Sequence, residues 1–200
     1  RFGADVGAAI VFPVAAVVAA AFAAGRPRLA WAGLAAALAA LVLPTIGERL
    51  VGLSLLGVAV WLTVNDVVRR QLRLTGQRRY LAAALLAGYV NLAVAGVVLT
   101  LYGLVGSTGS YDVVVHGVFL GFGVSMVMAH APVILPAVLG RPLPYRPILW
   151  LPLVLLHGGL LLRFVGDLAG LATLWRTGGV VTVAAMLVFV ATAVSLAVRR

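Results

Sequence analysis

Residues 111–136 read YDVVVHGVFLGFGVSMVMAHAPVILP, a run that is almost wholly apolar. An apolar run of about 18 residues or more is long enough to cross the hydrocarbon core of a bilayer as a helix. The same run contains His116 and His130, two of the three histidines in the chain. It therefore predicts a membrane-spanning helix that carries two imidazole side chains.

The composition of the whole chain gives the same indication. The 200 residues are 64% hydrophobic and 10% charged, with a mean hydropathy of +1.16. A soluble domain carries about 25% charged residues. The chain is therefore predicted to be an all-α, polytopic transmembrane helical bundle that lies in a lipid bilayer. Its net charge of +10 comes from arginines in short loops, which indicates membrane topology and no nucleic-acid partner. The absence of cysteine excludes thiolate-ligated clusters and disulfides within the chain.

About seven membrane-spanning segments are expected along the chain. Small residues in the second and fourth segments would allow close helix approach. The chain begins with Arg1, so residues 1–200 are expected to form a single transmembrane domain from a longer chain. The alternative for the first segment is a signal peptide. The segments are 5–24, 29–44, 50–68, 80–103, 111–135, 148–167 and 179–198, and the connecting loops include 44–48, 69–79, 106–110, 140–147 and 176–179.

The arginines predict the orientation of these segments. With the N-terminus outside and the C-terminus in the cytoplasm, eleven arginines fall on the cytoplasmic side and three on the outer side, as the positive-inside rule requires. The expected location is the cytoplasmic (inner) membrane. The loop 69–79 carries five arginines; they either contact anionic lipid headgroups or only fix the topology, and the second interpretation is favoured.

The histidines are candidates for holding a metal-centred cofactor, haem b or copper. In an α-helix, His130 lies roughly −40° around the axis and 21 Å along it from His116. Gly123 lies between them on the same face, so it is a further cofactor-binding candidate that would line a cofactor groove. His157 lies in the middle of the sixth segment. Two haems stacked across a membrane need four axial ligands, which three histidines cannot supply. The alternative is that the imidazoles only make hydrogen bonds within the bundle.

Arg163 is a further candidate, because it lies inside an apolar segment four residues before Asp167. It could hold an anionic group such as a haem propionate. A structural pair with Asp167, one helical turn away, is slightly favoured. Tyr89 and Asn91 are expected to form hydrogen bonds between helices.

Three stretches resemble NnrS-type membrane proteins: HGVFLGFGVSMVMAH at 116–130, LGRPLPYRP at 139–147 and LVLLHGGLLLRFVGDL at 153–168. NnrS-type proteins contain haem and copper, are linked to nitric oxide metabolism and distantly resemble haem–copper oxidases. The similarity is limited to about residues 116–167. It implies a role in denitrification-related redox chemistry beside a partner such as a cupredoxin or a copper nitrite reductase. Three histidines are too few for a complete haem–copper oxidase.

These observations leave three classes of function open. The first is a membrane module that binds haem or copper through His116, His130 and His157, for electron transfer or chemistry of nitric oxide and nitrite. The second is a cofactor-free anchor or assembly subunit of a larger homo- or hetero-oligomer. The third is a small-molecule or proton-coupled transporter. No catalytic residue is predicted, and enzymatic activity is left open.

Overall fold

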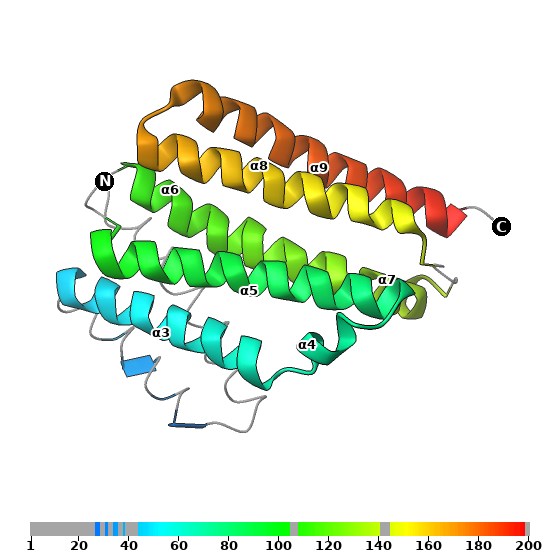
Figure 1. Cartoon of the computed structure of the whole chain (residues 1–200), viewed down its shortest axis with the longest axis horizontal. Helices are drawn as coiled ribbons and strands as arrows, with labels where there is room; N and C mark the ends of the chain where they lie inside the picture. Colours follow the sequence, from blue (N-terminus) through cyan, green and yellow to red (C-terminus); the bar gives the residue numbers. More distant parts are fainter. Residues whose placement is uncertain are drawn as a thin grey trace. The chain divides into compact units, whose positions relative to one another are not determined.

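The computed structural model describes residues 44–104, 108–140 and 145–198, together with 27, 28, 31, 34, 35 and 38. Within these residues every regular element is a helix and there is no strand (Figure 1). The all-α fold class is therefore confirmed for the described chain. The elements are α3 (Pro44–Asn65), α4 (Val68–Gln71), α5 (Gly76–Tyr102), α6 (Thr108–His116), the π-helix η1 (Gly117–Val124), α7 (Ser125–Leu139), the 3-10 helix η2 (Pro147–Leu149), α8 (Trp150–Ala169) and α9 (Ala172–Val198).

Five helices in the described chain are long and apolar enough to cross a membrane. They correspond to the last five of the seven expected segments, whereas segment 5–24 and most of 29–44 lie outside the described residues. The multi-pass membrane character follows from these five helices, because only a helix satisfies its backbone hydrogen bonds internally in lipid. Their bounds are Ile46–Asn65, Gly76–Tyr102, Gly109–Pro136, Pro147–Ala169 and Ala172–Ala197.

Two predicted loops lie wholly within helices, and each error has a physical reason. Two others are shorter than predicted, because α4 ends at Gln71 and α5 begins at Gly76 within 69–79, and α6 begins at Thr108 within 106–110. Residues 44–48 begin α3, because proline at the first helical position lacks only an N–H that has no partner there. Residues 176–179 lie inside α9. The glycines of this stretch allow helix contact, and the turn between α8 and α9 comes earlier, at Gly170, whose φ is +68°.

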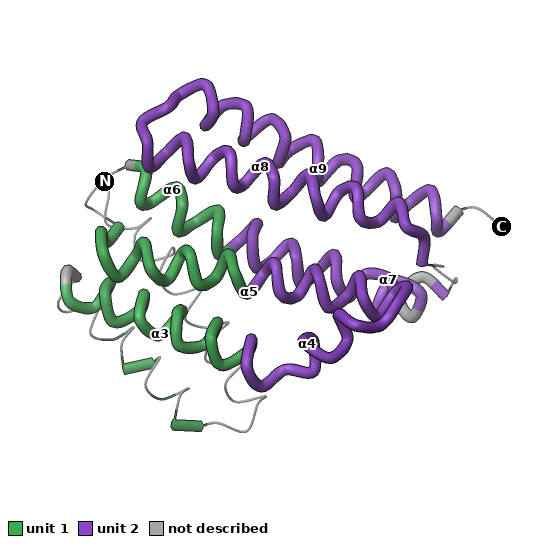
Figure 2. Tube along the Cα trace, viewed as in Figure 1, with its two compact units in different colours: residues 1–62, 90–118 green, residues 63–89, 119–200 purple. Residues whose placement is uncertain are grey.

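The chain divides into two compact units (Figure 2). Unit 1 takes its described residues from 1–62 and 90–118, and therefore includes most of α3, the second half of α5, and α6. Unit 2 takes its residues from 63–89 and 119–200, and includes α4, the first half of α5, most of η1, and α7 to α9. The prediction of a single domain over 1–200 stays a prediction.

In unit 1, α3 and α5 touch backbone to backbone. A Cβ atom built on Gly52 would lie 2.6 Å from the backbone nitrogen of Thr100, and one on Gly96 would lie 2.7 Å from that of Leu56. Only glycine permits such an approach. This confirms the expected role of small residues in the fourth segment, while the second segment lies mostly outside the described residues.

In unit 2, α8 and α9 form a hairpin with the same kind of contact along its length (Figure 1). A Cβ atom on Gly159 would lie 2.8 Å from the backbone nitrogen of Thr182, and Gly166 packs directly on the backbone of Trp175. The backbone N–H of Leu171 donates to the carbonyl of Gly166 at 2.8 Å, which closes the turn. Glycine spacing therefore sets the distance between the two helices.

The glycine contact in unit 1 predicts a difference between two alanine substitutions in α3. Gly52→Ala places its methyl group against the backbone of α5 and is expected to lower the free energy of unfolding by about 1–3 kcal/mol. Thermal unfolding of the purified protein in detergent measures the change.

Gly57→Ala is the matched control on the same helix. Among the described residues, no atom lies within 4 Å of a Cβ atom on Gly57, so this substitution should be neutral or raise stability by up to about 1 kcal/mol through helix propensity. Equal effects of the two substitutions would contradict the close α3–α5 contact.

Candidate functional site

The membrane-length helix Gly109–Pro136 is interrupted by a π-helix. The eight residues Gly117–Val124 have π-helical hydrogen bonding. Such stretches are rare and frequently occur at functional sites. This π-helix lies between His116 and Ser125 and contains Gly123, the glycine that was expected to line a cofactor groove. Gly123 is half-buried there.

The π-helix changes the basis for placing His116 and His130 on one face. That prediction assumed 100° per residue throughout, whereas a π-helix places more residues in each turn. The assumption is wrong over Gly117–Val124. In addition, His116 belongs to unit 1 and His130 to unit 2, so each histidine is described in its own surroundings.

His116 and His130 make the same hydrogen bond to their own helix. Nδ1 of His116 lies 2.9 Å from the carbonyl oxygen of Asp112, and Nδ1 of His130 lies 2.8 Å from that of Met126. A carbonyl oxygen can only accept, so in each ring Nδ1 carries the donated hydrogen. In the neutral imidazole the lone pair is then on Nε2. Metal-ligating histidines are typically oriented by this kind of second hydrogen bond.

His116 also has an acidic neighbour. Its Nδ1 lies 3.2 Å from Oδ1 of Asp112, one helical turn earlier, and its side chain is 28% exposed. The backbone carbonyl and the carboxylate of Asp112 therefore both contact Nδ1 of His116. This contact gives Asp112 a local role in orienting His116.

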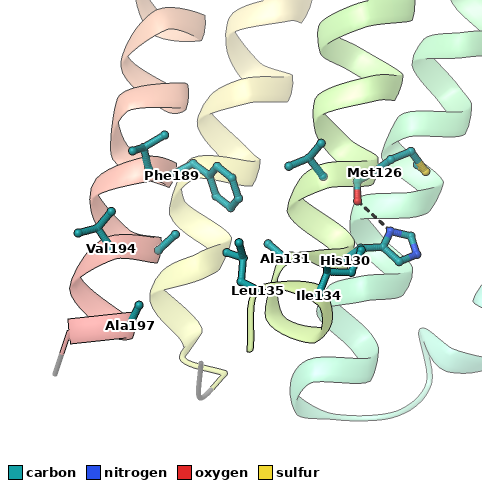
Figure 3. Close-up of a pocket in the computed structure, with 11 residues that line it drawn as sticks. Met126, His130, Ala131, Ile134, Leu135, Phe189, Val194 and Ala197 are labelled. Carbon is teal, nitrogen blue, oxygen red and sulfur yellow. Dashed lines mark hydrogen bonds between the residues drawn. The ribbon is translucent and has the colours of Figure 1, made fainter. Parts of the chain in front are cut away.

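His130 and Met126 lie one turn apart on the same side of α7. In Figure 3 both side chains point away from Phe189 and Val194 of α9. The Met126 methyl group lies next to Gly88 of α5, since a Cβ atom on Gly88 would be 2.9 Å from Met126 Cε. The imidazole and the thioether therefore share the side of α7 that meets α5.

A pocket of about 710 Å³ lies between α7 and α9. Its wall is apolar apart from His130, and in Figure 3 the imidazole is directed away from the α9 residues that close the pocket. The Nε2 lone pair of His130 is therefore directed away from α9. Residues of the wall include Val127, Ala131, Ile134 and Leu135 of α7 and Phe189, Val190, Ala193, Val194 and Ala197 of α9.

His157 makes a different hydrogen bond, which links α8 to the end of the π-helix. The Ser125 hydroxyl donates to the carbonyl of Gly121 at 2.6 Å, and Nε2 of His157 lies 3.0 Å from the same hydroxyl oxygen. Because Ser125 has one hydrogen and gives it to the carbonyl, the imidazole donates Nε2–H to Ser125. His157 therefore has the opposite tautomer to His116 and His130.

Arg163 contacts α9. Its guanidinium carbon lies 4.7 Å from the ring centroid of Trp175, in cation–π geometry. Gly178 packs on the Arg163 backbone, and a Cβ atom on Gly179 would lie 2.8 Å from Nη1. Gly178 thus allows the two helices to approach closely, and Gly179 leaves room for the guanidinium. The predicted pair with Asp167 stays a prediction.

Tyr89 confirms its expected role in hydrogen bonding between helices. Its hydroxyl donates to Oδ2 of Asp66 at 2.6 Å, which joins α5 to the segment between α3 and α4. Its ring lies 6.4 Å from that of Phe122 in η1. Asn91 is buried.

Sequence reasoning missed Ser125 and Trp175. Ser125 is the single hydroxyl residue between His116 and His130, and a hydroxyl in an apolar run typically bonds the carbonyl four residues earlier or another helix. That signal could have identified it. Trp175 lay in the stretch preceding the expected loop 176–179, so it was not placed opposite Arg163.

No group of three or more histidine, cysteine, aspartate or glutamate side chains that could hold a metal ion occurs within the part of the chain that the structure describes. A metal held by the described residues would therefore rest on one or two protein ligands of these types. Haem iron is suited to such a site, because the porphyrin supplies the other ligands.

Comparison with known proteins gives a match to a family model. The model of a family described as "Domain of unknown function (DUF8744)" matches residues 10–198. No curated protein and no solved structure matches the chain.

The Ser125–His157 contact predicts a stability effect. Ser125→Ala leaves Nε2–H of the half-buried His157 without the Ser125 acceptor and is expected to lower the free energy of unfolding by about 1–3 kcal/mol. Combining it with His157→Phe in a double-mutant cycle should give a coupling of about 0.6–1.7 kcal/mol, the range of hydrogen bonds between membrane helices.

Ser54→Ala is the control. The Ser54 hydroxyl also donates to the carbonyl four residues earlier, at 2.8 Å, but on an exposed face of α3. Its loss should change stability by less than about 0.5 kcal/mol. A coupling near zero between Ser125 and His157 would show that their contact does not hold α8 to η1.

Proposed function

The chain belongs to the DUF8744 family, and we propose that it is a multi-pass protein of the cytoplasmic membrane that binds a redox cofactor, haem b or copper. His116 and His130 are separate ligand positions, and each offers Nε2 to its own cofactor. The protein works in electron transfer or in redox chemistry of nitric oxide and nitrite, beside a partner such as a cupredoxin or a copper nitrite reductase.

The observation that carries the proposal is the shared hydrogen bond of the two histidines. In each, Nδ1–H is donated to the carbonyl four residues earlier, which directs the lone pair of the neutral ring to Nε2. Burial of a polar side chain in a membrane helix is costly and typically marks function. Two imidazoles that each donate Nδ1–H to their own helix fit that expectation.

The donor chemistry fits both cofactors. A b-type haem takes one or two imidazole ligands, and the apolar helices around His116 and His130 suit its macrocycle. Copper(I) accepts imidazole and thioether ligands, which His130 and Met126 offer from one side of α7. When bound, either group supplies one-electron redox chemistry, while the chain orients it and excludes water.

His157 and Arg163 take structural roles in this proposal. His157 donates Nε2–H to Ser125, so the atom that typically faces a haem iron is already engaged. Arg163 stacks on Trp175. These two contacts also support a second candidate function, a cofactor-free anchor or assembly subunit whose polar side chains only join helices.

The cofactor proposal is tested by the reduced-minus-oxidised visible spectrum of the protein purified from membranes, with iron and copper counted on the same sample. The sharp α band of a b-type haem, or copper without haem, is expected. His116→Ala and His130→Ala should each lower the cofactor content by about half or more, because each removes a proposed ligand.

His157→Ala is the control in the same measurement. It should keep the cofactor and lower the melting temperature, because it breaks the contact with Ser125. A folded wild-type protein without colour or metal would refute the cofactor proposal and leave the anchor function. Loss of the cofactor in His157→Ala alone would overturn the assignment of ligands.

The proposed orientation is tested by labelling with a membrane-impermeant maleimide on intact cells, since the chain has no cysteine of its own. Thr173→Cys, at the exposed start of α9, should be labelled directly. Thr75→Cys, exposed between α4 and α5, should be labelled only after the membrane is opened. The reverse pattern would place the arginine-rich loop outside.

A further inference from the structure

The connection between α3 and α5 lies at a membrane surface. It joins the membrane-length helices Ile46–Asn65 and Gly76–Tyr102, so it must lie where the chain leaves the bilayer and re-enters it. The short helix α4 lies in this connection, and its first residue, Val68, is fully buried. Five arginines lie within 69–79.

A pocket of about 670 Å³ opens beside this connection, in unit 2. Four of its lining residues carry side-chain hydrogen-bond donors: Gln71, Thr75, Gln77 and Arg78. The other three lining residues, Leu74, Leu81 and Val133, are apolar. The lining is therefore amphiphilic, and Arg78 is its one cation.

Aromatic side chains that pack on the first turn of α5 also indicate that this part of the chain lies at the membrane surface. Arg79 lines a separate pocket of about 370 Å³ with Tyr145 and Trp150. The Trp150 indole donates to the Tyr145 hydroxyl at 3.0 Å, and both rings pack on the buried Tyr80. Tryptophan and tyrosine are enriched at the level of lipid headgroups, so the first turn of α5 lies at this level.

We propose that the pocket lined by Arg78 binds an anionic phospholipid. The lipid phosphate takes its hydrogen bonds from Arg78 and the neighbouring amide and hydroxyl donors. An acyl chain leaves the pocket along Leu74, Leu81 and Val133 toward the bilayer. This site is independent of the cofactor proposed at His116 and His130.

The apolar part of the wall argues for a lipid over a free phosphate ion. A free phosphate would use only the polar donors and would make no contact with Leu74 and Val133, which are 42% and 54% exposed. A phospholipid covers both parts of the wall at once. Basic pockets at the surface of membrane proteins bind lipid headgroups for the same electrostatic reason.

The test is native mass spectrometry of the full-length, delipidated protein in detergent, titrated with phosphatidylglycerol. Phosphatidylcholine and inorganic phosphate are titrated in parallel. The wild type should bind phosphatidylglycerol at least about tenfold more tightly than phosphatidylcholine. Arg78→Gln should lower the affinity for phosphatidylglycerol by about tenfold or more, because it removes a charge-assisted hydrogen bond.

Two further variants make the result specific. Arg73→Gln removes an exposed arginine of the same loop that does not line the pocket; it should lower affinity by at most about fivefold, the general effect of one arginine near an anionic surface. Val133→Phe fills the apolar side without changing charge and should weaken binding about as much as Arg78→Gln. Val133 is exposed, so this variant is expected to fold.

Each alternative result overturns the site. Equal losses in Arg78→Gln and Arg73→Gln would show diffuse attraction without a pocket. Equal binding of phosphatidylcholine would remove the role of charge. Competition by inorganic phosphate at the same concentration as the lipid, with Val133→Phe unchanged, would identify a free anion as the ligand.

Discussion

Contact between helix backbones at glycine is the constraint on which both units of this protein depend. Lipid tails are as apolar as leucine, so helices in a bilayer gain little from burying apolar side chains against each other and must gain from close packing. Gly52 and Gly96 allow this contact in unit 1, and Gly159, Gly166 and Gly178 allow it in unit 2. The side chains that perform chemistry are positioned by helices whose separation these glycines set.

Polar side chains then join particular helices within unit 2. Tyr89 holds the segment between α3 and α4 through Asp66, His157 holds the end of the π-helix through Ser125, and Arg163 lies on Trp175. Each link consumes a donor or a charge that would be costly in lipid by itself. His116 and His130 differ, because their ring hydrogens are used within their own helix. This difference separates residues that join helices from residues that present a lone pair.

The sequence predicts the helical class and the approximate position of the last five segments, because length and hydropathy of a run are sufficient for that. It does not predict the π-helix, since GVFLGFGV at 117–124 has no polar residue to mark a change of helical period. It also misplaces the α8–α9 turn: Gly178 and Gly179 follow Arg176 as they would in a loop, yet they pack on Arg163. Glycine in a membrane helix has two uses, and only the partner helix distinguishes them.

Residue type indicates which side chains are candidate cofactor ligands. Among the histidines, the tautomer determines which ring nitrogen is able to bind a metal. The three histidines are equivalent in sequence, and a serine thirty-two residues before His157 determines which nitrogen of that ring carries hydrogen. No periodicity along the chain reports such a partner. Arg163 is similar, because its aromatic neighbour lies on the next helix.

The turn between α8 and α9 also bears on how the chain enters the membrane during synthesis. Only Gly170 and Leu171 separate the two helices, so there is no soluble loop that could be translocated before the second helix is made. An isolated arginine near the centre of an inserting helix costs about 2.5–3.5 kcal/mol. If the two helices enter as one hairpin, Trp175 accompanies Arg163 from the start, and the charge is already covered when the helix first meets lipid.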